Sequence, residues 1–378
     1  MSEPLMTPAS AVPTTTVWVG TYPAAGLGTP TGLGEGLWRL DLAADGAMQA
    51  HQVSTLPAPS FVVPHPRAAL LYVISESAPS ALHVVDPEAP AVPLATVTLP
   101  GTDSACHVMV APDGRALYVS TYHSGHLAVV RLGEDGLPLS EEPDQLFAYR
   151  GSGPVTGRQD TPHAHYACVS PDGGYVLVAD LGSDVVWAHS LGADGLLGEP
   201  AVALQVTPGA GPRHIAVRGT MLYLTSELDH QVRTLRWDAA SATAQEVDAQ
   251  PITHVVPRTG DEVCDAHLAW QTSAGAEVLL ASVRGPDVIA LFDVFPEGEL
   301  RFRASLDTGS WPRHFAVATD PAGVERLLVV NERGHEVRAF VLADVLALAP
   351  ESEVGAIAQL PYTSVAVTSP ACICPQPA

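Results

Sequence analysis

The chain has 378 residues, with 41 acidic and 18 basic side chains and a formal net charge of −23 at pH 7. This charge argues against nucleic acid or an anionic membrane as a partner, because both attract clusters of Lys and Arg. All 18 basic residues are Arg, which excludes a lysine Schiff base or a lysine nucleophile.

The sequence contains no apolar stretch of ~18 residues and no recognisable export signal, so we expect a cytoplasmic protein. The five cysteines are odd in number and lack paired metal-ligand spacing, which favours buried free thiols.

Residues 1–16 contain no strand-like run and are expected to form an N-terminal extension. From residue 17 to residue 378 one pattern recurs without a linker: a run of apolar and β-forming residues, then a second such run, with Pro, Gly, Asp and Ser at the junctions. The runs expected to form the second strand of each of the seven copies end at Tyr22, Glu76, Tyr122, Leu181, Glu227, Arg284 and Glu332. A strand repeat of about 50 residues is typical of a propeller. We therefore predict an all-β fold, a single seven-bladed β-propeller domain.

The two ends of the chain predict how this ring closes. The first copy begins at its second strand, since nothing in residues 1–16 resembles residues 61–66, the first strand of the second copy. Residues 372–377 match residues 61–66 proline for proline. We predict that this C-terminal segment supplies the innermost strand of blade one and that residues 363–368 form the outer strand of blade seven. Such a clasp leaves no open edge in the ring.

The strand order also predicts a site. In a propeller blade the first strand is innermost and the second returns beside it, so the start of the first and the end of the second meet next to the channel. Five first strands open with a histidine in the same phase: His107, His165, His214, His267 and His314. Together with His163, Arg213 and Arg313 shortly before three of them, they predict one polar depression on the axis.

These residues also have a structural interpretation. A histidine at a strand start is more often bonded to backbone than functional, and a repeated one can descend from a single ancestral blade. Arg213 and Arg313 could form ion pairs with the glutamates at the second-strand ends. The common phase of the histidines, and the Gly- and Pro-containing turns before both arginines, favour ligand contact. His123 and His126 are interpreted as solvated surface.

Seven phrases stand at corresponding places in the repeat: Val19-Gly-Thr-Tyr22, Pro59-Ser-Phe61, His163-Ala-His165, Ala179-Asp-Leu-Gly182, Gly211-Pro-Arg-His214, Ser226-Glu-Leu228 and Trp311-Pro-Arg313. Together they resemble the seven-bladed β-propeller lactonase family, which includes bacterial 6-phosphogluconolactonases and fungal carboxymuconate cyclases. The resemblance spans all seven blades and implies a catalytic set of His165, Arg213, Glu227 and Arg284. The chain departs from the family at Ser75 and Ser226, each of which replaces an Asn before the rim Glu. Because amide contacts near the site are lost, the resemblance defines the identity of the substrate less well than the type of chemistry.

Lactone hydrolysis needs an activated water, donors for the oxyanion and, for a phosphorylated sugar acid, a cationic anchor. His165 or Glu227 would activate the water, and Arg213 or Arg284 would hold the oxyanion. The other rim residues are predicted to bind a small anionic substrate: His107, His163, His214, His267, Arg313, His314, Glu76 and Tyr122. We expect hydrolysis of a sugar-acid lactone, with 6-phosphogluconolactone favoured, and neither a metal nor another cofactor.

Three other functions are weighed against this one. A cycloisomerase of the carboxymuconate type would use the same arginines for carboxylates. An interaction propeller would need no cluster in its channel, and a transition-metal site is disfavoured because opposite blades are too far apart to share one ion. The sequence leaves open the oligomeric state and which of His165 and Glu227 is the base.

Overall fold

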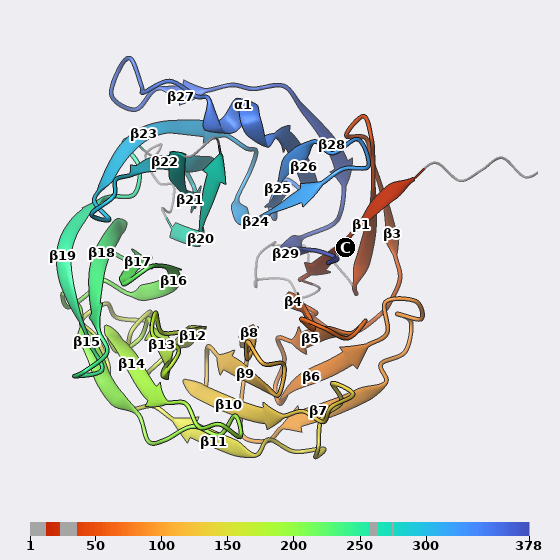
Figure 1. Cartoon of the computed structure of the whole chain (residues 1–378), viewed down its shortest axis with the longest axis vertical. Coiled ribbons are helices and arrows are strands. Elements are labelled where there is room, and N and C mark those ends of the chain that lie inside the picture. The colour runs from red at the N-terminus through yellow and green to blue at the C-terminus, as the bar shows by residue number, and fades with distance from the viewer. Residues whose placement is uncertain (1–12, 23–35, 257–263, 274–275, 378) are drawn as a thin grey trace, which may run out of the picture.

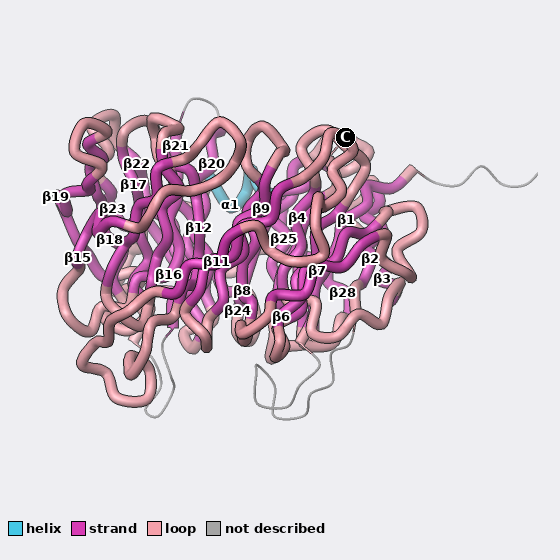
Figure 2. The backbone as a smooth tube through the Cα atoms, turned by 90° about the horizontal axis from the view of Figure 1, so that it is seen from below, coloured by secondary structure: helices cyan, strands magenta, loops and turns pink. Residues whose placement is uncertain are grey.

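The computed structural model describes residues 13–22, 36–256, 264–273 and 276–377. These residues form seven β-sheets that stand around a central axis as blades (Figure 1). From the side, the strands span the thickness of the ring and the loops lie mainly at its two faces (Figure 2). The fold is the all-β, seven-bladed β-propeller that the sequence predicts. Residues 1–12 of the expected extension lie outside the described residues, and the first strand begins at Thr14 instead of after residue 16.

Each blade is a sheet whose strands follow one another from the axis outward. Blade 1 consists of β29 (Pro370–Pro375), β1 (Thr14–Thr21), β2 (Trp38–Ala43) and β3 (Met48–Gln52). Blade 2 consists of β4 (Phe61–Pro64), β5 (Leu71–Ser75), β6 (Ser80–Val85) and β7 (Ala95–Leu99). Blade 3 consists of β8 (Ala105–Val110), β9 (Ala116–Thr121), β10 (His126–Arg131) and β11 (Gln145–Ala148). Blade 4 consists of β12 (Ala164–Val169), β13 (Tyr175–Asp180), β14 (Val185–Ser190) and β15 (Ala201–Gln205).

Blade 5 consists of β16 (Pro212–Arg218), β17 (Met221–Ser226), β18 (Gln231–Asp238) and β19 (Thr243–Pro251). Blade 6 consists of β20 (Cys264–Ser273), β21 (Ala276–Arg284), β22 (Val288–Val294) and β23 (Leu300–Asp307), with β27 (Ile357–Ala358) added parallel to β23. Blade 7 consists of β24 (Pro312–Thr319), β25 (Glu325–Asn331), β26 (Glu336–Val341) and β28 (Tyr362–Ala366). A short helix, α1 (Leu342–Leu346), follows β26. Within the described ranges, no helix has the length and apolar character needed to cross a membrane.

The core lies between the blades. Every residue of β9 and of β17 is buried, because these second strands are covered by a neighbouring blade on each face. A strand covered on both faces is a continuous apolar run, which is the pattern that made the repeat visible in the sequence. The described residues form seven apolar clusters, one at each interface between neighbouring blades.

Buried tyrosines of the second strands link one blade to the next. Each is the second residue of its run and donates its hydroxyl group to the carbonyl oxygen of a turn glycine in the following blade. The pairs are Tyr72 with Gly136 at 2.8 Å, Tyr118 with Gly195 at 3.0 Å, and Tyr223 with Gly298 at 3.1 Å. Because the hydroxyl groups are satisfied, these tyrosines fit a core that is otherwise apolar.

The ring closes as the sequence predicts. Strand β29 pairs antiparallel with β1, with Val17 opposite Pro375 and Val19 opposite Ile373. Strand β28 pairs with β26 as the outer strand of blade 7. The last residues of the chain therefore supply the inner strand of the blade that contains its first strand, beside the axis in Figure 1.

Removal of residues 361–378 should open this ring. The truncation deletes β28 and β29, so β1 would lose its inner partner and expose an unpaired edge. We expect the truncated protein to lose cooperative thermal unfolding, measured by circular dichroism and calorimetry. A variant without residues 377 and 378 is the control and should melt like the full chain. A truncated protein that melts cooperatively within a few degrees of the full chain would refute the clasp.

Candidate active site

Six inner strands of the described chain shift register near their start at a β-bulge, a position where one strand has an extra residue without a partner on its neighbour, and four of these strands are β8, β12, β16 and β24. The extra residue is Cys106 in β8, His165 in β12, Arg213 in β16 and Arg313 in β24. These four side chains line a pocket on the propeller axis. The bulge thus turns one side chain of each of these strands toward the pocket and lets the regular pairing resume one residue later.

This register corrects the phase that the sequence suggested for His165. Tyr166 pairs with Ala179 in blade 4 as His107 pairs with Ser120 in blade 3, each directly after the bulge. Tyr166 is therefore the member of the histidine layer in blade 4. His165 is one residue out of phase with the other four histidines and lies at the level of the pocket.

The pocket has a cavity volume of about 270 Å³ and receives at least one side chain from every blade or the connection before it. Its lining residues are Tyr22, Glu76, Cys106, Tyr122, His123, Arg158, His165, Arg213, Glu227, Arg284 and Arg313. All four residues predicted to be catalytic are among them. Of the eight predicted to bind substrate, Glu76, Tyr122 and Arg313 line this pocket.

A single carboxylate, that of Glu227, organises three arginines. Its Oε2 lies 2.7 Å from Arg213 Nε and 2.9 Å from Arg284 Nη2, and its Oε1 contacts Arg158 Nη2. Burial by itself would raise the pKa of Glu227, but the charges of Arg284, Arg213 and Arg158 outweigh it and hold the pKa well below its usual value. The carboxylate stays ionised, with both oxygens engaged by guanidinium groups.

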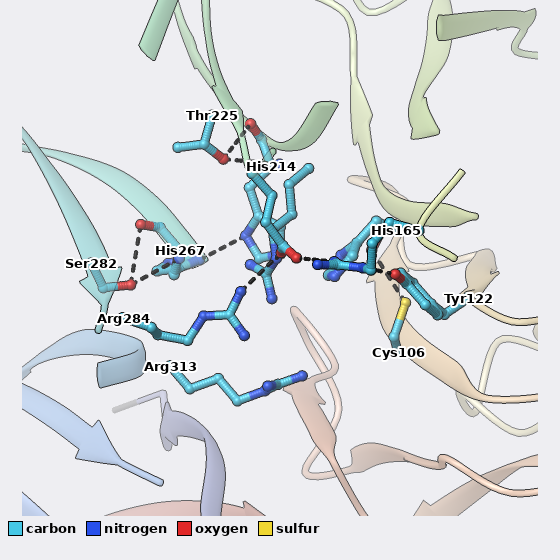
Figure 3. A network of polar contacts seen from close by, with 12 residues as sticks. Cys106, Tyr122, His165, His214, Thr225, His267, Ser282, Arg284 and Arg313 are labelled. Atoms are coloured by element: carbon cyan, nitrogen blue, oxygen red, sulfur yellow. Dashed lines mark hydrogen bonds and ion pairs between the residues drawn. The ribbon is translucent and has the colours of Figure 1, made fainter. Parts of the chain in front are cut away.

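Arg313 contacts residues of blades 1 and 7 instead of Glu227. Its Nη1 lies 3.0 Å from Oε2 of the buried Glu332, and its Nη2 donates to the hydroxyl group of Tyr22. Burial opposes the charge of Arg313, but Tyr22 and Glu332 stabilise it and raise its pKa. In Figure 3, Arg284 and Arg313 reach toward the channel from one side and His165 lies on the other.

His165 is the neutral polar group of the pocket. The side chain is buried, and burial together with the nearby charge of Arg213 lowers its pKa well below 6.5. Its Nδ1 has no hydrogen-bond partner within the described part of the chain. The neutral ring lines a pocket with several guanidinium groups, and a ring nitrogen that carries no proton can accept one from a bound water.

The other four histidines of the repeat lie outside this pocket, contrary to the rim that the sequence suggested. His214 and His314 line a smaller cavity of about 20 Å³ beneath it, and His107 and His267 line neither cavity. His267 stacks on His314 with ring centroids 4.0 Å apart, and its Nδ1 lies 3.2 Å from that of His214. These rings, with Phe61 and Tyr166, form a layer of imidazole and aromatic rings below the pocket, which we call the histidine floor.

Two histidines of the floor bond to the backbone of the next blade. His107 Nδ1 accepts from the backbone N–H of Ala167 at 3.3 Å, and His314 Nδ1 accepts from that of Ile373 at 3.4 Å. Burial lowers the pKa of both rings to about 3, so they are neutral at pH 7 and keep the lone pair that these bonds require. The floor therefore joins neighbouring inner strands.

His163 supports the pocket wall from behind. Its ring stacks on Tyr122 with centroids 4.3 Å apart, and its Nδ1 lies 2.7 Å from the carbonyl oxygen of Tyr122. Because Tyr122 lines the pocket and His163 does not, the contact of His163 with the site is indirect.

Four pocket residues were not among the predicted site residues, namely Tyr22, Cys106, His123 and Arg158. Arg158 belongs to the connection between β11 and β12, which is longer than the connections that lead into β8, β16 and β24. The length of this connection is the feature of the sequence from which a contribution to the site could have been predicted. His123, interpreted from the sequence as solvated surface, lies at the pocket although half of its side chain is exposed.

The side chains of the site do not combine into a metal-binding set. Among the residues that the structure describes, no three His, Cys, Asp or Glu side chains are placed to hold one ion. The four cysteines with described side chains, Cys106, Cys168, Cys372 and Cys374, are free thiols, as expected. The side chain of Cys264 is not among those that the structure describes.

The fold and the pocket define a β-propeller with an arginine-rich site on its axis. A model of the family described as "Lactonase, 7-bladed beta-propeller" matches residues 16–350. A 6-phosphogluconolactonase of Bacillus subtilis is 30% identical over 365 residues, which cover 94% of this chain and 97% of the relative. A 6-phosphogluconolactonase of Formosa agariphila is 28% identical over 303 residues, which cover 76% and 82%.

A solved structure points the same way. The periplasmic gluconolactonase of Pseudomonas aeruginosa is 25% identical and superimposes with a TM-score of 0.75 over 95% of this chain and 98% of that one. The chain belongs to the seven-bladed β-propeller lactonase family, as the sequence motifs indicated. Its class of activity is lactone hydrolysis.

The histidine floor should make stability depend on pH below neutrality. The four floor histidines have pKa values lowered mainly by burial, to about 3 for His107 and His314, whereas unfolded histidine titrates near 6.5. Below about pH 6.5 the unfolded state therefore binds more protons, and the free energy of unfolding falls by up to ~1.4 kcal/mol per pH unit for each ring. Equilibrium unfolding in urea between pH 7.5 and pH 5 would measure this slope.

His107→Phe should reduce the slope by about one proton, even though it also lowers stability by leaving the N–H of Ala167 without an acceptor. Phe61 shows that a phenyl ring fits this layer, since it packs 4.7 Å from His107. Tyr166→Phe, in the same layer but without a group that titrates in acid, is the control and should keep the slope. Equal slopes in all three proteins would contradict the assignment of neutral floor histidines.

Proposed function

We propose that the protein hydrolyses 6-phosphogluconolactone to 6-phosphogluconate without a metal ion. The observation that carries the proposal is the pocket lining, in which four arginines face two glutamates in a chain with a net charge of −23. The overall negative field of so acidic a protein repels anions. A local cluster of buried guanidinium groups is therefore best explained by a site for an anionic ligand. The names of the Bacillus and Formosa relatives agree with this substrate.

We assign the activation of water to His165 rather than Glu227. Both oxygens of Glu227 contact guanidinium groups, and the pKa of its carboxyl is held well below the usual value, so it is a weak base with no free oxygen. His165 is neutral and its Nδ1 has no partner among the described residues. The ion pairs of Glu227 therefore support His165 as the base.

The reaction then proceeds in balanced steps. His165 takes a proton from water as the water oxygen bonds to the lactone carbonyl carbon, and the carbonyl oxygen becomes an oxyanion near Arg213 and Arg284. When the oxyanion collapses, the bond between the carbonyl carbon and the ring oxygen breaks, and the imidazolium returns its proton to the ring oxygen. Glu227 acts as a positioning residue that holds the arginines.

We propose the cytoplasm as the location, since a phosphorylated sugar does not cross membranes unaided. The Pseudomonas relative is named a periplasmic gluconolactonase, so the phosphorylated and unphosphorylated lactones are the two substrates to compare.

Replacement of Arg213 or Arg284 by Ala should lower kcat/KM for 6-phosphogluconolactone by about 10²-fold or more, as when one oxyanion donor is removed. Arg213→Lys should recover little, because an ammonium group does not reproduce the planar fork. Rates are measured by acid release, corrected for spontaneous hydrolysis, with and without a chelator, and equal rates in both conditions are expected.

Arg218→Ala is the matched control for these substitutions. Arg218 is the last residue of β16, in which Arg213 is the second, and it pairs with Glu277 away from the pocket, so its removal should be nearly silent. Equal small effects at Arg213, Arg284 and Arg218 in folded proteins would place the chemistry elsewhere. Turnover of a muconolactone, with neither sugar lactone hydrolysed, would instead assign a cycloisomerase.

The pH profile should distinguish His165 from Glu227. A base whose pKa lies well below 6.5 gives a kcat/KM that is level near neutrality and falls in acid as the imidazole becomes protonated. His165→Ala should lower kcat by about 10²-fold and remove this acidic limb. Glu227→Gln should keep the limb and move it to lower pH, because Glu227 raises the pKa of His165.

The profiles are recorded only where circular dichroism shows a folded protein, since the histidine floor also responds to acid. An acidic limb that survives in His165→Ala and disappears in Glu227→Gln would make Glu227 the base.

A further inference from the structure

The four arginines of the pocket differ in how deeply they lie. The exposed fraction of the side chain is 3% for Arg213 and 7% for Arg284, but 18% for Arg313 and 38% for Arg158. Arg158 is thus the arginine at the pocket mouth. It comes from the connection between β11 and β12, whereas the other three come from inner or second strands.

The segment that carries Arg158 is held in place by buried hydrogen bonds. The neighbouring Gln159 is fully buried and donates from Nε2 to Asp184 Oδ1 at 2.7 Å and to the carbonyl oxygen of Leu181 at 2.9 Å. Asp184 also accepts from the backbone N–H of Gly211, two residues before Arg213, at 2.8 Å. One buried carboxylate therefore sets the position of the connection that carries Arg158 relative to the turn that carries Arg213.

The contacts of Arg158 leave part of its guanidinium group available. The described residues contact it through Nη2, which reaches Glu227 Oε1 and lies 3.5 Å from the hydroxyl oxygen of Tyr122. A guanidinium group carries five N–H donors, so the N–H groups of Nε and Nη1 remain as donors for anion oxygens. Burial raises the pKa of Tyr122, so its hydroxyl group stays protonated and can donate beside Arg158. The half-exposed ring of His123 lines the same part of the pocket.

The deep arginines are arranged differently. Arg213 and Arg284 both contact Oε2 of Glu227, whereas Arg158 contacts Oε1, so the width of one carboxylate separates two groups of donors. Arg313 is engaged by Glu332 and Tyr22 on the far side. A ligand with two separated electronegative groups, a reacting carbonyl and a distant anion, matches these two groups.

We propose that Arg158, with the hydroxyl group of Tyr122 and the ring of His123 beside it, forms the subsite for the phosphate group of the substrate. The proposal rests on the proposed function, and it moves the phosphate contact from Arg313, which the sequence suggested, to the pocket mouth. Arg158 is then the residue that makes a phosphorylated lactone a better substrate than an unphosphorylated one.

The test compares two substrates, 6-phosphogluconolactone and glucono-δ-lactone. Arg158→Ala should lower kcat/KM for the phosphorylated lactone by about 10-fold or more, mainly through KM, because one charge-assisted contact is lost. The same change should alter kcat/KM for glucono-δ-lactone by less than about 3-fold. Arg150→Ala is the matched control, because Arg150 is an exposed arginine of the same connection that does not line the pocket.

The alternative is that Arg158 acts only through Glu227. In that case Arg158→Ala would slow both lactones by the same factor, and this result would overturn the subsite. Arg158→Gln is the second variant if the Ala variant does not fold, with the same expected ratio between substrates.

The subsite can fail separately from the proposed function. If the unmodified protein hydrolyses neither lactone, the proposed function fails, and the subsite is judged by titration calorimetry with 6-phosphogluconate and with inorganic phosphate. Binding of 6-phosphogluconate that weakens by about 10-fold in Arg158→Ala but not in Arg150→Ala would support the subsite. Equal binding by all three proteins, or no binding by any of them, would overturn it.

Discussion

The antiparallel pairing of β29 with β1 is the constraint on which the remaining structure depends. It joins the two ends of the chain in one sheet, so the inner strands stay at fixed distances around the axis. The pocket needs this closure directly, because Arg313 of blade 7 donates to Tyr22, which follows β1 in blade 1. It also brings Ile373 to His314, which accepts from its backbone N–H. An open ring would therefore lose a wall of the pocket and part of its floor together.

Inside the closed ring, charge compensation by Glu227 decides what the site can do. Arg213 and Arg284 are nearly fully buried, and the pKa of Arg213 is lowered to about 10 by burial and by the charge of Arg284. Without the carboxylate between them, the two guanidinium groups would repel each other in a medium of low dielectric constant. Glu227 holds them close, and His165 beside them stays neutral, as the proposed base requires. Arg213 and Arg284 contact one oxygen of this carboxylate, and Arg158 contacts the other. The pocket therefore has a deep pair of donors and a separate donor at its mouth.

The histidine repeat shows where the prediction from sequence succeeded and where it could not. Together with the family resemblance it led to one pocket on the axis, since Arg213, Glu227, Arg284 and His165 all line it. It could not separate the pocket level from the floor, because a β-bulge adds one residue without changing the apolar pattern that follows. Arg158 lies outside the repeat altogether, in a connection without a counterpart of similar length before β8, β16 or β24.

The sequence by itself determined the number of blades, the closure of the ring by the C-terminal segment, and the lactonase family. The number of blades and the closure follow from apolar runs and turn residues that recur along the chain, and the family follows from the resemblance of seven short sequence phrases. The tertiary structure alone decided which histidines reach the pocket, which carboxylate is occupied by arginines, and which arginine stands at the mouth. Those outcomes depend on bulge register, burial and contacts between residues distant in the chain, such as Arg158 and Glu227, and no local pattern encodes them.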